Sequence, residues 1–131
     1  MNPKPSQQTP RLALSLCAAL AVAFTLPLEG LPARAHHGWG SFDTSQTLDV
    51  SAAVIRSTWA NPHGVVVLAV DGKEVTVELA PVSRMTARGL TPEAIAAGRT
   101  VRVFAYRNSS DPLLYRAEWI EADGKRVQLR R

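Results

Sequence analysis

The sequence predicts a small, mainly β protein with one short helix, preceded by a cleaved signal peptide. Apolar and polar residues alternate along most of the chain after residue 47, which is typical of strands with one buried face. Asp-Gly pairs at 71–72 and 123–124 indicate tight hairpin turns between strands. The first 35 residues differ: a charged start, an apolar run and a small-residue stretch are typical of a secretion signal.

The N-terminal segment predicts export. Residues 12–26 form an apolar run of about 15 residues, short of the ~20 that a membrane-spanning helix needs. Ala33 and Ala35 occupy the small-residue positions before the cleavage point of a signal peptide, so the mature protein is expected to begin at His36. We therefore expect a periplasmic or secreted protein, with no stable membrane anchor after cleavage.

The composition after cleavage fits one small domain. Removing 35 of the 131 residues leaves 96, with 12 basic and 10 acidic side chains and a formal charge of +2. No run of basic and aromatic residues indicates a nucleic-acid partner. The single cysteine, Cys17, lies in the apolar run, so the mature chain has no thiol. The expected organisation is a signal peptide at 1–35, an irregular N-terminal arm at 36–46 and a β domain at 47–131.

Three strands are expected in the first half of the domain. From residue 47 toward Trp59, apolar residues fall on one face, and the turn at 61–64 breaks the pattern because proline lacks an N–H donor. Residues 65–70 are all apolar, as in a strand covered on both faces. Residues 75–79 alternate again, which predicts a third strand with one solvated face.

Residues 82–98 are the only helical pattern of the mature chain: a short helix is expected near Thr91–Ala97, and Ser83–Arg88 can add a turn before Gly89. Thr91 can cap the helix, Pro92 suits its first position and Gly98 suits its end. Strand patterns resume at 101–106 and 113–121, followed by a terminal piece. The second of these strands is expected to place Tyr115, Ala117 and Trp119 on one face and Arg116 and Glu118 on the other.

The order of three strands, a helical connection and two further strands predicts an OB-fold-like Greek-key barrel. In that fold the helix lies between the third and fourth strands. An SH3-like barrel and a small β-sandwich are the competing architectures. The predicted strand order is also similar to that of periplasmic OB-fold stress proteins.

Several short motifs resemble a family of exported bacterial proteins, called domain of unknown function six-one-five-two. The motifs are His36-His37, Phe42-Asp43, Asn61-Pro62-His63, Arg88-Gly89 and Gly98. With the signal peptide, the resemblance covers nearly the whole mature chain, and its most specific part is the His-His start followed by Asn-Pro-His. The resemblance implies a small secreted β-barrel domain and no established activity.

The three histidines form a candidate copper site. After cleavage, the free amine and ring of His36 could hold copper(II) together with the ring of His63, in a T-shaped brace of nitrogen ligands. A second arrangement needs only the amine, the following amide nitrogen and the ring of His37. In a third interpretation, His36 and His37 are a solvated tail and His63 is a turn residue. Structural zinc is disfavoured because the mature chain has no cysteine ligands.

A binding module without a metal is the alternative function. Such a module would hold a partner protein or a small ligand on the barrel face and loops. The expected contacts or supporting residues are Trp39, Asp43, Trp59 and Asn61. The domain's aromatic residues are otherwise expected to belong to the core. No grouping of nucleophile, acid and base predicts an enzyme.

Overall fold

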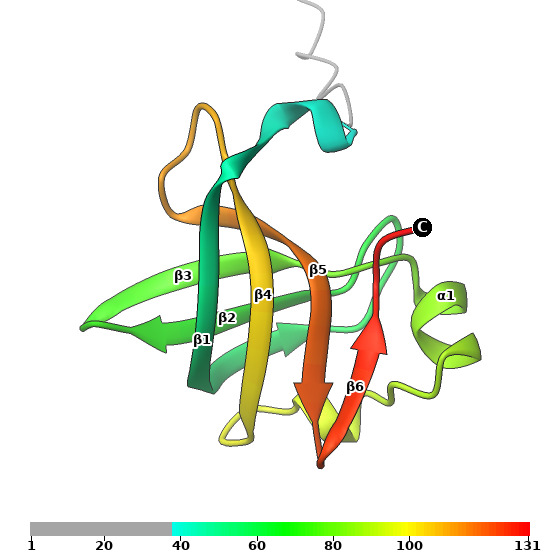
Figure 1. Ribbon diagram of the computed structural model, residues 1–131. Coiled ribbons are helices and arrows are strands. Elements are labelled where there is room, and N and C mark those ends of the chain that lie inside the picture. The colour runs from blue at the N-terminus through cyan, green and yellow to red at the C-terminus, as the bar shows by residue number, and fades with distance from the viewer. Residues whose placement is uncertain (1–37) are drawn as a thin grey trace, which may run out of the picture. The chain divides into compact units, whose positions relative to one another are not determined.

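Alternating apolar residues give a mainly β structure, as the sequence predicts. The computed structural model describes residues 38–131, so the predicted signal peptide, His36 and His37 lie outside the described residues. Within the described residues, the chain forms six strands and one short α-helix, arranged as in Figure 1. The elements are η1 (Trp39–Ser41), β1 (Phe42–Thr58), β2 (Val65–Val70), β3 (Lys73–Glu78), α1 (Val82–Ala87), η2 (Glu93–Ile95), β4 (Thr100–Asn108), β5 (Leu114–Ala122) and β6 (Lys125–Gln128).

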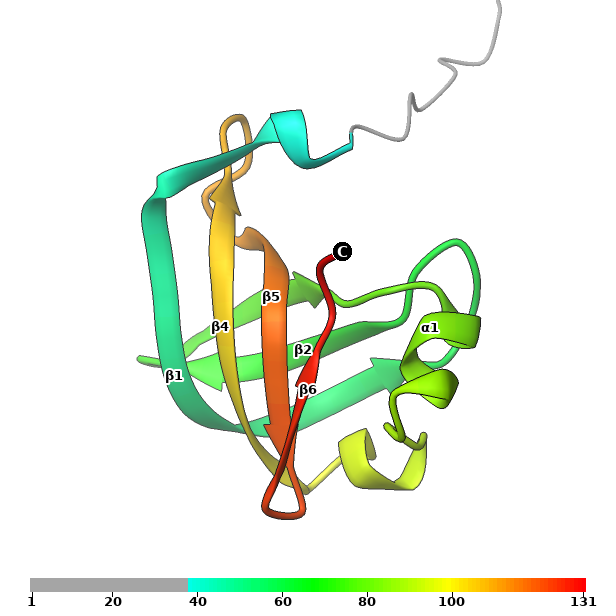
Figure 2. The ribbon, with the colours of Figure 1, turned by 45° about the vertical axis from the view of Figure 1, so that its right-hand side comes forward.

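The strands form one sheet that closes into a ring. Their order is β3-β2-β1-β4-β5-β6, with antiparallel neighbours, and β3 makes an additional parallel pairing with β5. This pairing places Glu78 directly opposite Arg116 and joins five strands in the cycle β1-β2-β3-β5-β4. β6 extends the sheet beyond β5 (Figures 1 and 2).

The long strand β1 connects two parts of the ring. Its first part, 42–53, pairs with β4, and its last part, 54–58, pairs with β2. Figure 2 shows the strand curving between these two partners. β1 begins at Phe42, earlier than Thr47, because Phe42 and Asp43 pair with Asn108 and Arg107 beyond a register shift. The strand therefore includes residues that the sequence predicts to be irregular.

The core inside the ring is aliphatic. Val66, Val67 and Leu68 are buried in succession, so β2 is covered on both faces at its centre, as predicted. The expectation that the aromatic residues form the core holds only in part: Trp59 and Tyr115 pack against the core, whereas Phe104, Tyr106 and Trp119 are half-buried on outward-facing strand positions. Phe42 alone among the described aromatic residues is buried, with 6% of its surface exposed. The largest fully buried side chains are Leu68, Leu79, Met85, Ile95, Ile120 and Leu129.

Both predicted hairpin turns are confirmed. Asp71 and Gly72 have φ angles of 50° and 75°, and Asp123 and Gly124 have φ angles of 50° and 74°. Two successive residues in the left-handed region match the twist of the flanking strands, which explains the Asp-Gly sequence at each turn. These turns connect β2 to β3 and β5 to β6.

The predicted position of the helix is wrong. The α-helix is Val82–Ala87, while the segment near Thr91–Ala97 forms only the three-residue turn η2. Pro92 occupies the N-cap position of this turn, and the hydroxyl of Thr91, one residue earlier, accepts a hydrogen bond from the amide of Ala94 at 3.3 Å. The backbone becomes extended at Ala96, so the turn does not propagate. One turn gains too few hydrogen bonds to offset helix nucleation, and burial of Ala94 and Ile95 holds it instead.

A bulge in β5 changes the predicted faces of that strand. Ala105 pairs with Ala117 but Phe104 pairs with Trp119, so one extra residue, Glu118, is inserted in β5. Trp119 therefore points outward and stacks on Phe104 at a centroid distance of 5.9 Å. The expectation that Trp119 shares a face with Ala117 is wrong. Ile120 takes the inward position after the bulge and is fully buried.

Candidate functional site

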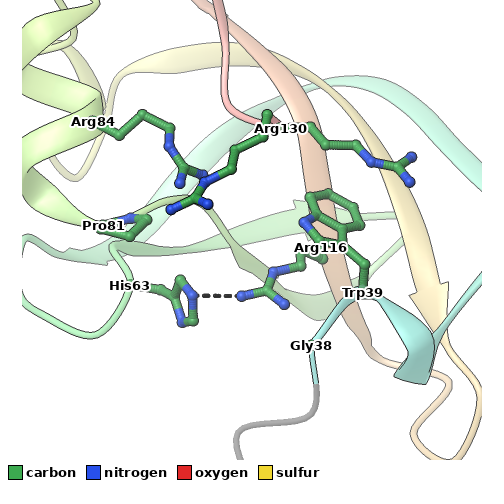
Figure 3. A pocket seen from close by; sticks show the side chains of 8 residues that line it. Gly38, Trp39, His63, Pro81, Arg84, Arg116 and Arg130 are labelled. Carbon is green, nitrogen blue, oxygen red and sulfur yellow. Dashed lines mark hydrogen bonds between the residues drawn. The ribbon is translucent and has the colours of Figure 1, made fainter.

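A pocket lies where η1, the 61–64 turn, α1 and the C-terminal segment approach β5. Its cavity volume is about 420 Å³. Figure 3 shows Arg84 and Pro81 on one side of it and Arg116 and Trp39 on the other. The lining residues are Gly38, Trp39, His63, Pro81, Arg84, Arg116, Arg130 and Arg131.

Arg116 is the buried residue at this site. It lies on β5, and its side chain is only 6% exposed. The β3–β5 pairing brings its Nε to 3.7 Å from a carboxylate oxygen of Glu78, an ion pair longer than a hydrogen bond. The sequence predicts Arg116 on a polar face. That face is covered here, because Trp39 and Phe42 pack over the guanidinium at 5.2 and 5.5 Å from their ring centroids.

His63 meets Arg116 across the pocket. The Nη2 group of Arg116 hydrogen-bonds to Nε2 of His63, as the dashed line in Figure 3 shows. A guanidinium has only donors, so Nε2 accepts and the ring proton of a neutral His63 belongs on Nδ1. The lone pair that a metal at Nε2 would need is thus directed at a cation. Copper binding through this nitrogen requires the Arg116 contact to open.

Trp39 holds two arginines at the pocket wall. Its indole lies under Arg116 and also under Arg130, whose guanidinium carbon is 4.5 Å from the ring centroid. Arg130 donates a hydrogen bond to Glu118 at 3.2 Å. Tyr106 packs edge-on against Trp39 at 6.1 Å, and burial, followed by the nearby Glu118, raises the pKa of its phenol. Cation–π contacts of this kind orient a guanidinium without neutralising it.

Arg84 comes to the pocket from α1. Asn61 supports the start of this helix, because its side-chain oxygen accepts a hydrogen bond from the amide of Val82 at 3.3 Å. Arg84 donates to the carbonyl of Leu129 at 3.1 Å, which connects the helix to the C-terminal segment. Burial lowers the pKa of Arg84, and the neighbouring charges of Arg131, Arg88 and Arg116 lower it further. Arg84 therefore lies in a region of positive potential.

The lining set is strongly cationic. Four arginines face the pocket and the lining contains no acidic side chain, although Glu78 and Glu118 pair with Arg116 and Arg130 nearby. Guanidinium groups stay protonated at any biological pH and match carboxylate and phosphate oxygens with paired N–H donors. The arrangement is therefore chemically suited to an anion.

The structure places the sequence-predicted site residues in different regions. Trp39 and His63 line the pocket together. Trp59 packs against the hydrophobic core, and Asn61 supports α1. Asp43 is exposed on β1, where hydrogen bonds from the hydroxyl and amide of Ser45 lower its pKa. These last three residues are not in the pocket lining.

His36 and His37 lie outside the described residues, so the predicted three-histidine site is not described as a whole. Within residues 38–131, no group of three or more histidine, cysteine or acidic side chains is arranged to hold a metal ion. In the same part of the chain, no helix combines the length and the apolar character needed to cross a membrane.

The sequence analysis did not predict the arginines of the pocket as site residues. Arg84, Arg116 and Arg130 are separated by 32 and 14 positions in the sequence, and only folding brings them together. No local signal marks Arg116, because it falls on the expected polar face of an alternating strand.

The fold and the site define a small, mainly β protein with an arginine-lined pocket beside a closed ring of strands. The chain belongs to the family of unknown function DUF6152, whose model matches residues 25–112. This match confirms the resemblance predicted from the His-His and Asn-Pro-His motifs. It includes Arg84 and ends before Arg116, Arg130 and Arg131. No curated protein matches the chain.

Proposed function

We propose that the protein is an exported binding module that holds a small anion, without a metal, in the arginine-lined pocket. The observation that carries this proposal is the set of four arginines around one cavity whose lining contains no acid. Guanidinium groups stabilise an anion through charge-assisted hydrogen bonds worth about 1.5–3 kcal/mol each. A cation in the same cavity would be repelled.

Several arginines are held in place before a ligand arrives. Arg116 contacts His63, Glu78 and Trp39, while Arg130 contacts Glu118 and Trp39. Immobilising a long side chain on binding costs about 0.5–1.5 kcal/mol, so side chains that are already ordered favour affinity. The surrounding contacts thus support a binding site more than a solvated basic patch.

The strand topology and the N-terminal sequence support the two other parts of the proposal, a barrel fold and export. The cycle β1-β2-β3-β5-β4, with α1 between β3 and β4, supports an OB-like Greek-key barrel. The apolar run and Ala33-Arg34-Ala35 support export by a cleaved signal peptide.

The intact mass of protein recovered from a periplasmic extract tests export. A mass that begins at His36 is expected, and retention of Met1 with the apolar run would exclude it.

Binding of citrate tests the pocket directly. Protein beginning at His36 is titrated with citrate by calorimetry at low ionic strength, alongside Arg130→Gln and the control Arg102→Gln. Arg102 lies on the outer face of β4 and is absent from the lining. We expect binding that weakens with added salt and falls about tenfold in Arg130→Gln, since one charge-assisted bond is lost. Absence of binding by citrate, phosphate and simple carboxylates up to about 10 mM contradicts the proposal.

Copper binding is the second candidate function, and one observation favours it. Gly38 and Trp39 line the same pocket as His63, and His37 directly precedes Gly38. The predicted copper ligands of the mature N-terminus are therefore the direct sequence neighbours of residues that line this pocket. The guanidinium groups oppose a dication there, which is why the anion proposal comes first.

Four proteins distinguish the copper arrangements. They are the chain beginning at His36, the same chain with an added methionine before His36, His37→Ala and His63→Ala. A brace predicts that the added methionine and His63→Ala each weaken copper(II) binding about a hundredfold, or ~2.8 kcal/mol. A peptide-like chelate predicts that His37→Ala is damaging and His63→Ala has no effect. Equal binding by all four, at millimolar copper only, contradicts both arrangements.

A further inference from the structure

The pocket is larger than a single anionic group. Its volume of about 420 Å³ corresponds to roughly 14 water molecules, at about 30 Å³ of liquid volume each. One carboxylate or one phosphate fills only a fraction of that space. A ligand that excludes water from the pocket therefore has several more heavy atoms than the anionic group that it presents.

The charged side chains at the site have a net positive charge. Arg116 and Arg130 have acidic partners in Glu78 and Glu118. Arg84 donates to a backbone carbonyl, which carries no net charge, and Arg131 completes the cationic lining. Four arginines and two glutamates give these side chains a net charge of +2. A ligand with two negative charges would balance it.

The cationic groups are divided between two walls. Arg84 extends from α1 beside Pro81, and Figure 3 shows it across the cavity from Arg116 and Trp39. Arg131 lines the same pocket as Arg84, and after burial its charge contributes to lowering the pKa of Arg84, as the charges of Arg88 and Arg116 also do. Trp39 groups Arg116 with Arg130 by packing against both. Arg84 and Arg116 therefore offer anchor points on two walls, and each wall also carries an apolar side chain, Pro81 beside Arg84 and Trp39 beside Arg116.

We infer that the pocket takes a small organic dicarboxylate, with one carboxylate at Arg84 and Arg131 and the other at Arg116 and Arg130. This inference rests on the proposed anion-binding function and specifies its ligand class. A short methylene chain between the carboxylates would pass Pro81 and the edge of Trp39. A compact dianion such as hydrogen phosphate has the right charge but reaches one anchor point only.

A series of dicarboxylates tests the two-anchor arrangement. Protein beginning at His36 is titrated with malonate, succinate, glutarate and adipate, and with butyrate and inorganic phosphate, at constant ionic strength. We expect an optimum at one chain length and at least about tenfold tighter binding than butyrate, because a second charge-assisted contact forms. Phosphate binding as tightly as the best dicarboxylate, or no dependence on the second carboxylate, overturns this inference while the anion proposal stands. Failure of every anion overturns both.

A double-mutant cycle locates one anchor. Succinate and its monoamide, succinamate, are compared on wild-type protein, Arg84→Gln and Arg88→Gln. Arg88 is a matched control, because it is the C-cap residue of α1, one turn after Arg84, and donates to the carbonyls of Gln128 and Arg130, but does not line the pocket.

We expect succinamate to bind about tenfold more weakly than succinate to wild-type protein and to Arg88→Gln. In Arg84→Gln that ratio should fall toward one, because the partner of the second carboxylate is gone. The same ratio in all three proteins, with all of them folded by circular dichroism, overturns the assignment of Arg84 as an anchor. The ratio is unaffected by a uniform loss of affinity, so a merely structural role of Arg84 would not change it.

Discussion

Two tryptophan–arginine clusters in this protein use the same residue types in different surroundings. In the pocket cluster, Trp39 lies against Arg116 and Arg130. In the sheet-face cluster, on the outer side of β4 and β5, Trp119 lies against Arg102 and Arg126 at 5.7 and 3.9 Å. The number of arginines that each tryptophan contacts therefore does not distinguish the two regions.

The clusters differ in charge balance and in access to water. Arg102 makes two hydrogen bonds to Asp49 at 2.9 and 3.0 Å, and Arg126 pairs with Glu121 at 3.2 Å, all with exposed side chains. In the pocket cluster Arg116 is buried, and Arg84 and Arg131 add charge that Glu78 and Glu118 do not balance. The comparison teaches that enclosure and uncompensated charge, rather than stacking, mark the candidate site.

The largest predicted difference is in stability. Arg116→Ala should lower the free energy of unfolding by about 3 kcal/mol, because it removes one partner of a largely buried ion pair and uncovers Trp39 and Phe42. Arg102→Ala should change stability little, because its ion pair is solvated. Urea denaturation of both variants measures the difference. Similar losses in the two variants would mean that burial does not separate the clusters.

A smaller effect concerns the phenol of Tyr106. Burial raises the pKa of Tyr106 above its ordinary value of 10.0, so the folded state retains this proton more strongly than the unfolded state. This contribution to stability is complete below pH 10.0 and is lost as the pH rises through the folded pKa. Trp39→Ala should expose the phenol and bring its pKa back toward 10.0.

Ultraviolet difference titration measures this change, with Trp119→Ala as the matched control in the sheet-face cluster. Trp119 stacks on Phe104, and the contact of Tyr106 with a tryptophan is to Trp39. A pKa of Tyr106 that moves equally in the two variants would contradict the covering role of Trp39.

The smallest predicted effect is at Asp49. A hydrogen bond from Arg102 holds the pKa of this carboxyl below its ordinary value of 3.8. The associated stability is present above pH 3.8 and is lost as the pH falls through the lowered pKa of the folded state. Carbon-detected NMR titration should show the pKa of Asp49 returning toward 3.8 in Arg102→Ala. An unchanged pKa would show that the pairing with Arg102 does not persist in solution.

Local sequence patterns were sufficient to predict the strands and the hairpin turns between them. The apolar run Val65–Val70 and the Asp71-Gly72 turn predicted β2 and its hairpin because both depend on neighbouring residues only. The helix was misplaced for the opposite reason. α1 depends on burial of Met85, on Asn61 at its start and on Leu129 at the C-terminal segment, which lie outside its own sequence.

The candidate site was predicted less well than the fold. Trp39 and His63 were selected from the sequence, and they do line one pocket. The burial of Arg116 was not predictable from alternation, because it depends on Trp39 and Phe42 covering an outward-facing position. The bulge at Glu118 also has no clear signature in a single sequence, yet it determines that Trp119 joins the outer face.

The hydrogen bonds from α1 to the C-terminal segment also affect when the pocket is completed during folding. Arg84 and Arg88 reach carbonyls 40 to 45 residues further along the chain, and the cavity is lined by residues from Gly38 to Arg131. Contacts with such large sequence separation form late, after the chain entropy of closing long loops has been lost. We therefore expect the pocket to be largely absent from the folding transition state. A bound ligand would then slow unfolding and leave the rate of folding nearly unchanged.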